Sequence, residues 1–277
     1  MNYRHIYHAG NFADVFKHCI LIMLIQSLFE KDKPILYLDT HAGIGKYNLT
    51  TEAVQKTKEY ENGITRIYNL HSFPAVIQTY QHIVSTINSH NKNLHFYPGS
   101  PLIIRALLRT QDHMILTELH QEDIQVLKHE FRQDKQVTVH NMDGYQGLKP
   151  FLPPKCGRGL ILIDPPFEEK NEFEQIIAGL QIALKRFAGG IYMVWYPIKN
   201  QDEVNRFYAN LKNINCKNIL ITELAISKSA LNLGLTSCGL AIINAPWQFE
   251  IELKNVIPWL SKALMIDPTG EWNVRYL

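Results

Sequence analysis

Short runs of consecutive apolar residues recur along the chain, and stretches with helical periodicity lie between them. A run such as Leu160-Ile161-Leu162-Ile163 is typical of a strand that is buried on both faces of a parallel sheet. The pattern predicts strands at 35–38, 114–117, 137–139, 160–163, 191–195, 219–224 and 240–243. It predicts helices at 14–29, 101–109, 122–131, 173–187, 202–213 and 252–264. This alternation indicates an α/β, Rossmann-like fold.

The last two predicted strands are separated by residues 225–239 only, which are too few for a comfortable helical crossover. Parallel neighbours need such a crossover, so we expect these two strands to pair antiparallel. The predicted sheet is therefore seven-stranded and mostly parallel, with its last strand pair antiparallel.

Residues 46–97 depart from this alternation. Apolar residues such as Leu70, Phe73, Ile77 and Tyr80 fall at helical spacing there, and no convincing strand is present. The apolar content is too high for a linker. We predict a small helical subdomain at 46–97, inserted into a main domain formed by 1–45 and 98–277.

Composition and charge limit the function classes. Of 277 residues, 46% are hydrophobic, which excludes a disordered chain. Lys and Arg number 28 against 26 Asp and Glu, a net charge of +2, which excludes an arginine-rich binder. Any contact with nucleic acid must come from a local patch.

The chain carries no sign of export, membrane insertion or metal binding. Residues 1–10 do not resemble a signal peptide, and the apolar stretch 20–29 is shorter than a membrane span. The four cysteines are scattered without a C-x-x-C pair, and the histidines lack zinc-site spacing. We expect a cytoplasmic protein with reduced thiols and no metal.

The sharpest chemical signal is Asp164-Pro165-Pro166-Phe167, which directly follows the predicted strand 160–163. The prolines keep the backbone extended and leave their carbonyls free as acceptors. The Asp164 carboxylate and the Pro165 carbonyl can each accept one N–H of an exocyclic amine, while Phe167 stacks on the heterocycle. This pattern predicts chemistry on a base amine more strongly than a chance strand-ending turn.

A second signal is the turn Gly43-Ile44-Gly45, which follows the first strand and Asp39. The third glycine of a dinucleotide fingerprint is missing, because Asn48 stands there, and this counts against NAD. The turn instead suits a nucleoside without a pyrophosphate. Glu118, at the end of the second strand, could accept from both ribose hydroxyls or could be a solvated strand end.

Two further segments have both a functional and a structural interpretation. Asp143-Gly144 follows the third strand and could accept from a cofactor adenine amine, or could form an ordinary turn. Ser100-Pro101 predicts a helix N-cap followed by a proline in the first turn, close to the expected cleft.

The N-terminal segment is dense in polar and aromatic residues. On pattern alone we expect Asp14 to cap a helix and Lys17 to lie on its solvated face, although Lys17 also has the charge to bind a carboxylate. The segment offers three side chains that could contact RNA: Tyr3, Arg4 and His5.

Together, Asp39-x-x-x-Gly43-x-Gly45 and Asp164-Pro165-Pro166-Phe167 resemble class I S-adenosylmethionine-dependent methyltransferases that act on amino groups. Longer segments closely resemble the bacterial ribosomal RNA large subunit methyltransferase J family, and the resemblance covers essentially the whole chain. These segments are 3–5, 8–18, 36–43, 97–103, 116–120 and 159–166.

The resemblance implies that a monomeric enzyme methylates N6 of one adenine in 23S ribosomal RNA, with S-adenosylmethionine as donor. Asp164 would be the catalytic residue, with Pro165 and Phe167 holding the base. The implied cofactor site comprises Lys17 near the methionine end, His18, Asp39, His41, Gly43, Ser100, Glu118, Asp143, Gly144 and Asp164. Tyr3, Arg4, His5 and Phe167 would contact the RNA.

The chain departs from the family at one place that bears on the substrate. Family members usually carry Tyr after the two prolines, and this chain has Phe167. Phe at this place also occurs in guanine-N2 methyltransferases of ribosomal RNA, so that activity is one alternative. A DNA adenine-N6 methyltransferase is a second, and an RNA-binding ribosome assembly factor without activity is a third.

Overall fold

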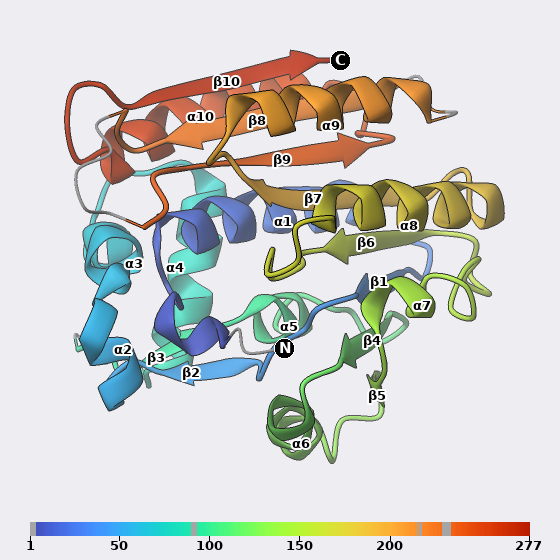
Figure 1. The fold of residues 1–277 in the computed structure, drawn as a ribbon. Coiled ribbons are helices and arrows are strands. Elements are labelled where there is room, and N and C mark those ends of the chain that lie inside the picture. Colours follow the sequence, from blue (N-terminus) through green and yellow to red (C-terminus); the bar gives the residue numbers. More distant parts are fainter. Residues whose placement is uncertain (1–3, 90–92, 215, 217, 229–233) are drawn as a thin grey trace.

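An eight-stranded sheet runs through the molecule in the order β10-β8-β9-β7-β6-β1-β4-β5 (Figure 1). The computed structural model describes residues 4–89, 93–214, 216, 218–228 and 234–277. The strands of this sheet are β1 (Leu36–Asp39), β4 (His113–Glu118), β5 (Val137–Asn141), β6 (Gly159–Ile163), β7 (Ile191–Pro197), β8 (Ile219–Ala225), β9 (Ser237–Ile243) and β10 (Glu271–Tyr276).

Strands β5, β4, β1, β6 and β7 are parallel to one another, whereas β9 is antiparallel to both β7 and β8. All seven predicted strands and the antiparallel pair are confirmed. The eighth strand, β10, pairs antiparallel with β8 at the sheet edge and was not predicted. Its sequence is largely polar, and only Val274 is fully buried, so it lacks the apolar run that marks the other strands.

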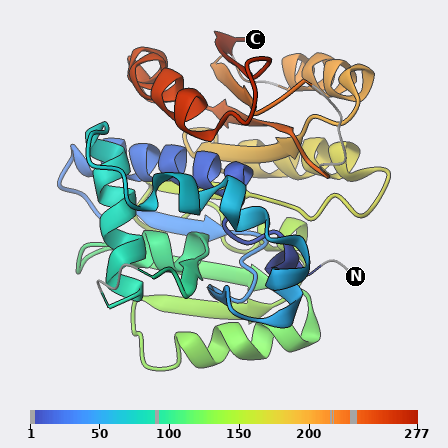
Figure 2. The ribbon, with the colours of Figure 1, turned by 90° about the vertical axis from the view of Figure 1, so that its left-hand side faces the viewer.

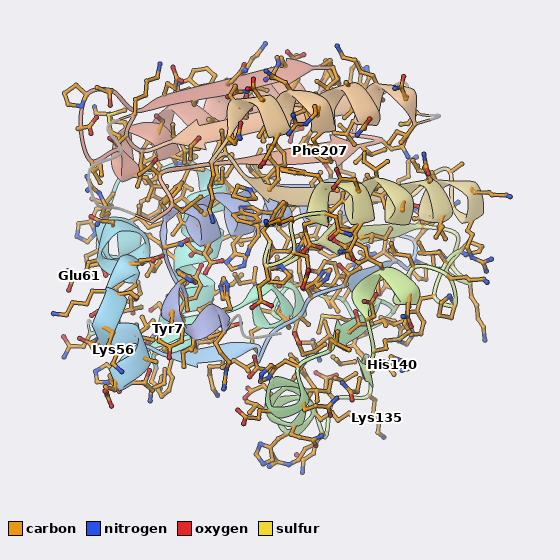
Figure 3. The ribbon with its side chains drawn as sticks, in the orientation of Figure 1. Tyr7, Lys56, Glu61, Lys135, His140 and Phe207 are labelled. Carbon is orange, nitrogen blue, oxygen red and sulfur yellow. The ribbon has the colours of Figure 1, made fainter. Side chains whose placement is uncertain are left out.

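Helices cover both faces of the sheet, and Figure 2 separates the layers. Leu160 and Leu162 of β6 face the core under α1 and α10, while Ile161 and Ile163 face the core under α8 and α9. Figure 3 shows side chains filling both layers, with Phe207 of α9 among them. The helices outside residues 46–98 are η1 (His5–Tyr7), α1 (Phe12–Phe29), α5 (Ser100–Arg105), α6 (Gln121–Glu130), α7 (Gly144–Gly147), α8 (Glu172–Arg186), α9 (Gln201–Asn213) and α10 (Phe249–Leu264).

Helix α1 is apolar on nearly all sides because it is enclosed by the sheet, α4, α5 and α10. Its 18 residues are long and apolar enough to cross a membrane, but 83% of that stretch is buried inside the protein. The expectation that this apolar stretch is far shorter than a membrane span is therefore wrong, and the helix is a core element. The expected cap is also wrong: Asn11 caps α1 by accepting from the Asp14 backbone N–H.

Between β1 and α5, residues 46–98 form a compact set of short elements. They are β2 (Lys46–Asn48), α2 (Glu52–Thr57), η2 (Glu59–Asn62), α3 (Ile64–Tyr68), α4 (Ala75–Ile87) and β3 (Phe96–Pro98). The expectation that this segment has no strand is wrong, because β2 and β3 pair antiparallel and close its two ends. Each strand has three residues, which is too short for a recognisable alternation.

Candidate active site

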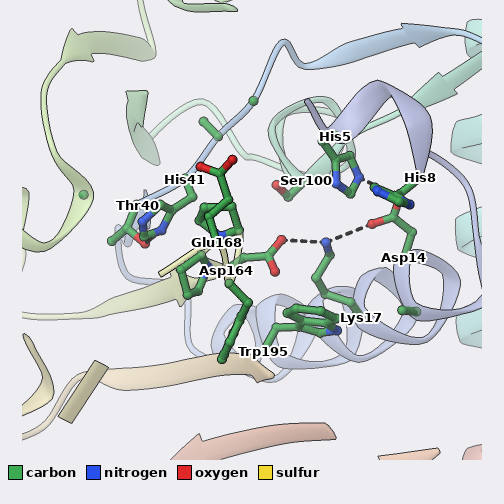
Figure 4. Close-up of a pocket in the computed structure, with 18 of the residues that line it drawn as sticks. His5, His8, Asp14, Lys17, Thr40, His41, Ser100, Asp164, Glu168 and Trp195 are labelled. Atoms are coloured by element: carbon green, nitrogen blue, oxygen red, sulfur yellow. Dashed lines mark hydrogen bonds and ion pairs between the residues drawn. The ribbon is translucent and has the colours of Figure 1, made fainter. Parts of the chain in front are cut away.

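A cavity of about 450 Å³ opens at the carboxyl ends of β1, β4 and β6 (Figure 4). Parallel α/β sheets bind ligands at this edge, next to the point where the strand order reverses. Most of the predicted site residues line it: His5, Lys17, His18, His41, Gly43, Ser100, Glu118, Asp143, Gly144, Asp164, Pro165 and Phe167. Asp39 lies fully buried beneath the cavity.

The centre of the cavity holds an ion cluster of two carboxylates and one ammonium. Lys17 Nζ donates to Asp164 Oδ2 at 2.6 Å and to Asp14 Oδ1 at 2.9 Å, as the dashed lines in Figure 4 show. The Lys17 side chain is only 5% exposed, so the expectation of a solvated face is wrong. Within the described part of the chain, Asp164 Oδ1 has no hydrogen-bond partner.

Asp14 is the most enclosed member of this cluster. Its Oδ2 accepts from the Gly10 backbone N–H and pairs with His5 Nε2, both at 2.9 Å. Burial raises the pKa of the Asp14 carboxyl, but the charges of His5 and Lys17 outweigh it and hold the pKa well below its usual range. Burial likewise lowers the pKa of Lys17, and the two carboxylates reverse this and raise it.

The segment after β6 presents an aromatic ring to the cavity. Phe167 has a φ of 51°, in the left-handed region that bulky residues rarely adopt. Its ring makes edge contacts with Phe173 at 5.1 Å and Trp195 at 5.8 Å between centroids. Strained backbone of this kind concentrates at functional sites, where neighbouring packing maintains it.

Beneath the cavity, Asp39 is held by neutral donors. The hydroxyls of Tyr37 and Ser100 donate to Asp39 Oδ2 at 2.9 and 2.6 Å, and the His41 N–H donates to Oδ1. Burial raises the pKa of Asp39 to about 6, although the hydroxyls oppose it. The expected cap at Ser100 is wrong: Gly99 occupies that position, and Ser100 is the first residue of α5, which ends at Arg105 rather than 109.

Glu118, at the end of β4, has both carboxylate oxygens engaged. Oε2 accepts from the Gly43 N–H at 2.8 Å and Oε1 from the His120 N–H at 2.7 Å. These bonds orient the carboxylate at the cavity wall and fix the turn after β1, where Gly43 has a φ of 61°. Burial raises the pKa of Glu118. The alternative of a solvated strand end is therefore wrong, since Glu118 is buried.

Asp143 caps α7 by accepting from the Gln146 N–H, so the turn after β5 is a helix start. A Cβ at Gly144 would lie 2.1 Å from the Thr40 carbonyl oxygen, so only glycine fits between β1 and α7. His41 makes an edge contact with Tyr145 of α7, and burial lowers the His41 pKa to about 4.

His18 forms part of the cavity wall from α1. Its Nδ1 pairs with the Tyr97 hydroxyl at 2.8 Å, while Nε2 is buried without a partner among the described residues. Burial lowers the pKa of His18 to about 3, so the ring is neutral. A buried polar atom without a partner in a cavity wall is suited to a ligand's hydrogen-bonding group.

The predicted RNA contacts have different outcomes. Tyr3 lies outside the described residues. Arg4 pairs with Glu122 at 2.7 Å and Asp123 at 3.2 Å, and so bridges the N-terminal segment to α6. His5 is engaged with Asp14, as described above. No group of three or more His, Cys, Asp or Glu side chains suitable for a metal occurs within the described ranges.

Sequence reasoning missed several contributors to the cavity. Among them, Asp14 was taken for a cap, and Trp195 of β7 was predicted only as part of the strand 191–195. One signal pointed to Asp14: Asp14 and Lys17 stand three residues apart in a helix that is otherwise apolar all round, where buried charges need partners.

Comparisons with known proteins agree with this architecture over the full chain. A model of the family described as "Ribosomal RNA large subunit methyltransferase D, RlmJ" matches residues 32–277. The "Ribosomal RNA large subunit methyltransferase J" proteins of Escherichia coli and Haemophilus influenzae are 44% and 40% identical, each over 100% of this chain and 99% of that protein. The crystal structure of protein LPL1258 from Legionella pneumophila has a TM-score of 0.88 and 37% identity, covering 97% of this chain and 98% of that one.

Proposed function

Because this chain belongs to the Ribosomal RNA large subunit methyltransferase D, RlmJ family, we propose that it methylates N6 of one adenine in 23S ribosomal RNA. Its fold is that of class I methyltransferases, and its methyl donor is S-adenosylmethionine. The proposal adds the base, the atom and the residues that carry the reaction.

One observation carries the proposal: Asp164 has one oxygen fixed by Lys17 and the other without a partner among the residues that the structure describes, at a cavity also lined by Pro165 and Phe167. An exocyclic amine has two N–H groups, and the open Asp164 oxygen and the Pro165 carbonyl are acceptors for them. The Phe167 ring can stack on the heterocycle, with edge contacts to Phe173 and Trp195 keeping it in place.

The residues of the neighbouring wall fit the methyl donor. His18 Nε2 is buried and has no partner in the described part of the chain, and a polar group of the ligand would satisfy it. Glu118 is oriented by two backbone N–H groups and suits ribose hydroxyls, and Asp143 suits an adenine amine. We propose that the remaining contacts come from Lys17, His41, Gly43, Ser100, Gly144 and Asp164, with Asp39 supporting the turn from below.

When bound, S-adenosylmethionine supplies a methyl group on a positively charged sulfur. The protein's part is to hold the amine nitrogen, with its lone pair directed at that methyl group, after the adenine has been flipped out of its surroundings. Asp164 would hold the neutral amine through its open oxygen. As the N–C bond forms, the bond from the methyl carbon to the donor sulfur breaks and S-adenosylhomocysteine is left, and Asp164 would take up the proton that the amine releases. Lys17 keeps Asp164 in place throughout.

Phe167 favours a second candidate, guanine-N2 methylation of ribosomal RNA, because that alternative shares the sequence Asp-Pro-Pro-Phe. The same carboxylate and carbonyl would hold the guanine N2 amine. The two candidates share the mechanism and differ in the product nucleoside.

Further parts of the proposal concern the rest of the molecule. We propose a monomeric, cytoplasmic enzyme whose RNA contacts come from Tyr3, Arg4, His5 and Phe167. We also propose that 46–97 acts as an inserted subdomain within 1–45 and 98–277, since the pairing of β2 with β3 brings the ends of this segment together.

The test is methyl transfer from labelled S-adenosylmethionine to unmodified 23S RNA, followed by nucleoside digestion and mass spectrometry. We expect N6-methyladenosine, and a rate lowered by about 10³-fold or more in Asp164→Ala with S-adenosylmethionine affinity largely retained. Asp202→Ala, at an exposed carboxylate on α9, is the matched control and should leave the rate unchanged.

Each other product identifies an alternative. N2-methylguanosine would replace adenine by guanine and keep the role of Asp164. Faster transfer to duplex DNA than to RNA would favour a DNA adenine methyltransferase. Full activity in Asp164→Ala would refute the assignment of this residue, and absence of S-adenosylmethionine binding would favour an assembly factor.

A further inference from the structure

Asp14 is a buried carboxylate to which the proposed chemistry has so far given no task. It lies one helical turn before Lys17 on α1, and its side chain is 2% exposed. Three donors converge on it: Lys17 Nζ on Oδ1, and His5 Nε2 and the Gly10 N–H on Oδ2. A carboxylate held from both sides in this way has a fixed position.

The position of Asp14 determines how Lys17 meets Asp164. The ammonium lies between the two carboxylates and reaches only Oδ2 of Asp164 (Figure 4). Without the hydrogen bond and the charge attraction from Asp14, the Lys17 ammonium would be free to move toward Asp164 and to bind both of its oxygens. The oxygen that the target amine needs would then be taken.

Resting on the proposed function, we propose that Asp14 is a positioning residue for methyl transfer. It holds the Lys17 ammonium away from Oδ1 of Asp164, and it adds the negative charge that favours a cationic methyl donor over its neutral product. Leaving His5 aside, the ionised Asp14 and Asp164 and the protonated Lys17 sum to a charge of −1, and Asp14→Asn removes one negative charge from the cluster whatever the state of His5. S-adenosylmethionine carries a sulfonium charge that this surplus attracts, whereas S-adenosylhomocysteine does not.

Lys17 and Asp14 act as fixed charges and not as a proton wire. The neighbouring carboxylates raise the pKa of Lys17, and the neighbouring cations hold the pKa of Asp14 low, so a proton has no tendency to pass from Lys17 to Asp14. The ionisable groups around the cluster include His5, His8, His18, Asp39 and His41, and burial lowers the pKa of His18 to about 3, so that this ring is neutral at working pH.

The experiment measures binding of S-adenosylmethionine and S-adenosylhomocysteine to wild type and Asp14→Asn by calorimetry, together with kcat on 23S RNA. We expect Asp14→Asn to lower the affinity for S-adenosylmethionine by about tenfold and to change the affinity for S-adenosylhomocysteine by less than about threefold. We also expect kcat to fall by about tenfold or more. An equal loss of affinity for both ligands would indicate that Asp14 has a purely structural role and would overturn the proposal.

Two further variants keep the test decisive. Asp112→Asn removes another buried carboxylate, which pairs with Arg109 outside the cavity, and should lower stability without changing the ratio of the two affinities. Asp14→Glu keeps the negative charge but lengthens the side chain, so the carboxylate takes another position. The ratio of the two affinities should stay within about twofold of the wild-type ratio, while kcat falls. Unchanged kcat in Asp14→Glu would refute the positioning role, even if Asp14→Asn does not fold.

The transfer assay on wild type tests the proposed function separately from the role of Asp14. If wild type binds both ligands but transfers no methyl group to 23S RNA, the assigned substrate is wrong. The affinity ratio in Asp14→Asn would still decide whether Asp14 supplies the surplus charge.

Discussion

The two sides of the cavity hold their buried carboxylates in opposite ways. Asp14 and Asp164 share a full positive charge on Lys17, and the pKa of Asp14 lies well below its usual range. Asp39 and Glu118 are held by hydroxyl and backbone N–H groups, and burial raises the pKa of both. The same residue type therefore has opposite titration behaviour within one cavity.

The difference shows what each kind of partner can do. Positive charges beside Asp14, among them Lys17 at 2.9 Å, more than offset the cost of burying this carboxylate, so Asp14 and Lys17 keep their charges across the working pH range. Neutral donors offset only part of that cost, so burial raises the pKa of Asp39 to about 6 and also raises the pKa of Glu118. The side with fixed charges is the one where the proposed reaction needs a constant field.

Removing the Lys17 ammonium should abolish the difference in titration behaviour between the two sides of the cavity. This change has the largest expected effect on stability and on methyl transfer. Lys17→Met leaves Asp14 and Asp164 buried without their counter-ion, which costs about 3–5 kcal/mol of the free energy of unfolding. It also leaves Asp164 unanchored, so methyl transfer should fall by about 10³-fold or more. Urea unfolding and the transfer assay measure the two effects.

The pH dependence of stability distinguishes the loss of the Lys17 charge from a loss of packing. In wild type, Lys17 contributes stability at all pH values below its ordinary pKa, and the low pKa of Asp14 contributes stability that is lost as pH falls below about 4. Lys17→Met should therefore be most destabilised at neutral pH and should approach wild type in acid. An equal deficit at pH 3.5 and pH 7.5 would contradict the charge argument.

Asp39→Asn tests the side of the cavity that is held by neutral donors, and its expected effect on the free energy of unfolding is intermediate. A folded-state pKa of about 6, raised from 3.8, means that the folded protein binds the Asp39 proton more tightly than the unfolded chain does. Wild type therefore loses up to about 3 kcal/mol as pH rises from about 4 to 6. Asp39→Asn has no proton to lose there, so its stability relative to wild type should rise by that amount between pH 4 and pH 7.

Urea unfolding of both proteins at a series of pH values measures this relative change. Other buried groups, such as His41 and Glu118, titrate in both proteins and cancel in the difference. Parallel stability curves for the two proteins would show that folding does not raise the pKa of Asp39.

The carboxyl edge of the sheet could be predicted from local sequence. Asp164-Pro165-Pro166-Phe167 and the turn at Gly43 each follow an apolar run, so their place in the fold comes from the fold class alone. The seven apolar strands were found for the same reason. β2, β3 and β10 were missed because they are short or polar, and hydrogen bonds to a neighbouring strand define them.

The ion cluster could not be predicted, because it depends on contacts between distant segments. Lys17 and Asp164 are 147 residues apart, and His18 meets Tyr97 from the inserted segment. A helix pattern cannot show that α1 is enclosed on all sides, so Lys17 was assigned to solvent. The resemblance to a family placed Lys17 in the site but gave no indication of its partner Asp14.

The finest test of the contrast is Ser100→Ala, which removes one neutral donor from Asp39 and leaves its charge. The hydroxyl lowers the pKa of Asp39, so its loss should raise that pKa above about 6 and cost about 1 kcal/mol or more where Asp39 is ionised. The deficit should be smaller below pH 5, where Asp39 is protonated in both proteins. Thr117→Val is the control, because the Thr117 hydroxyl donates to the neutral Thr40 carbonyl and its loss should have no pH dependence. If the two variants lose the same stability at every pH, the Ser100 hydroxyl does not act through the Asp39 charge.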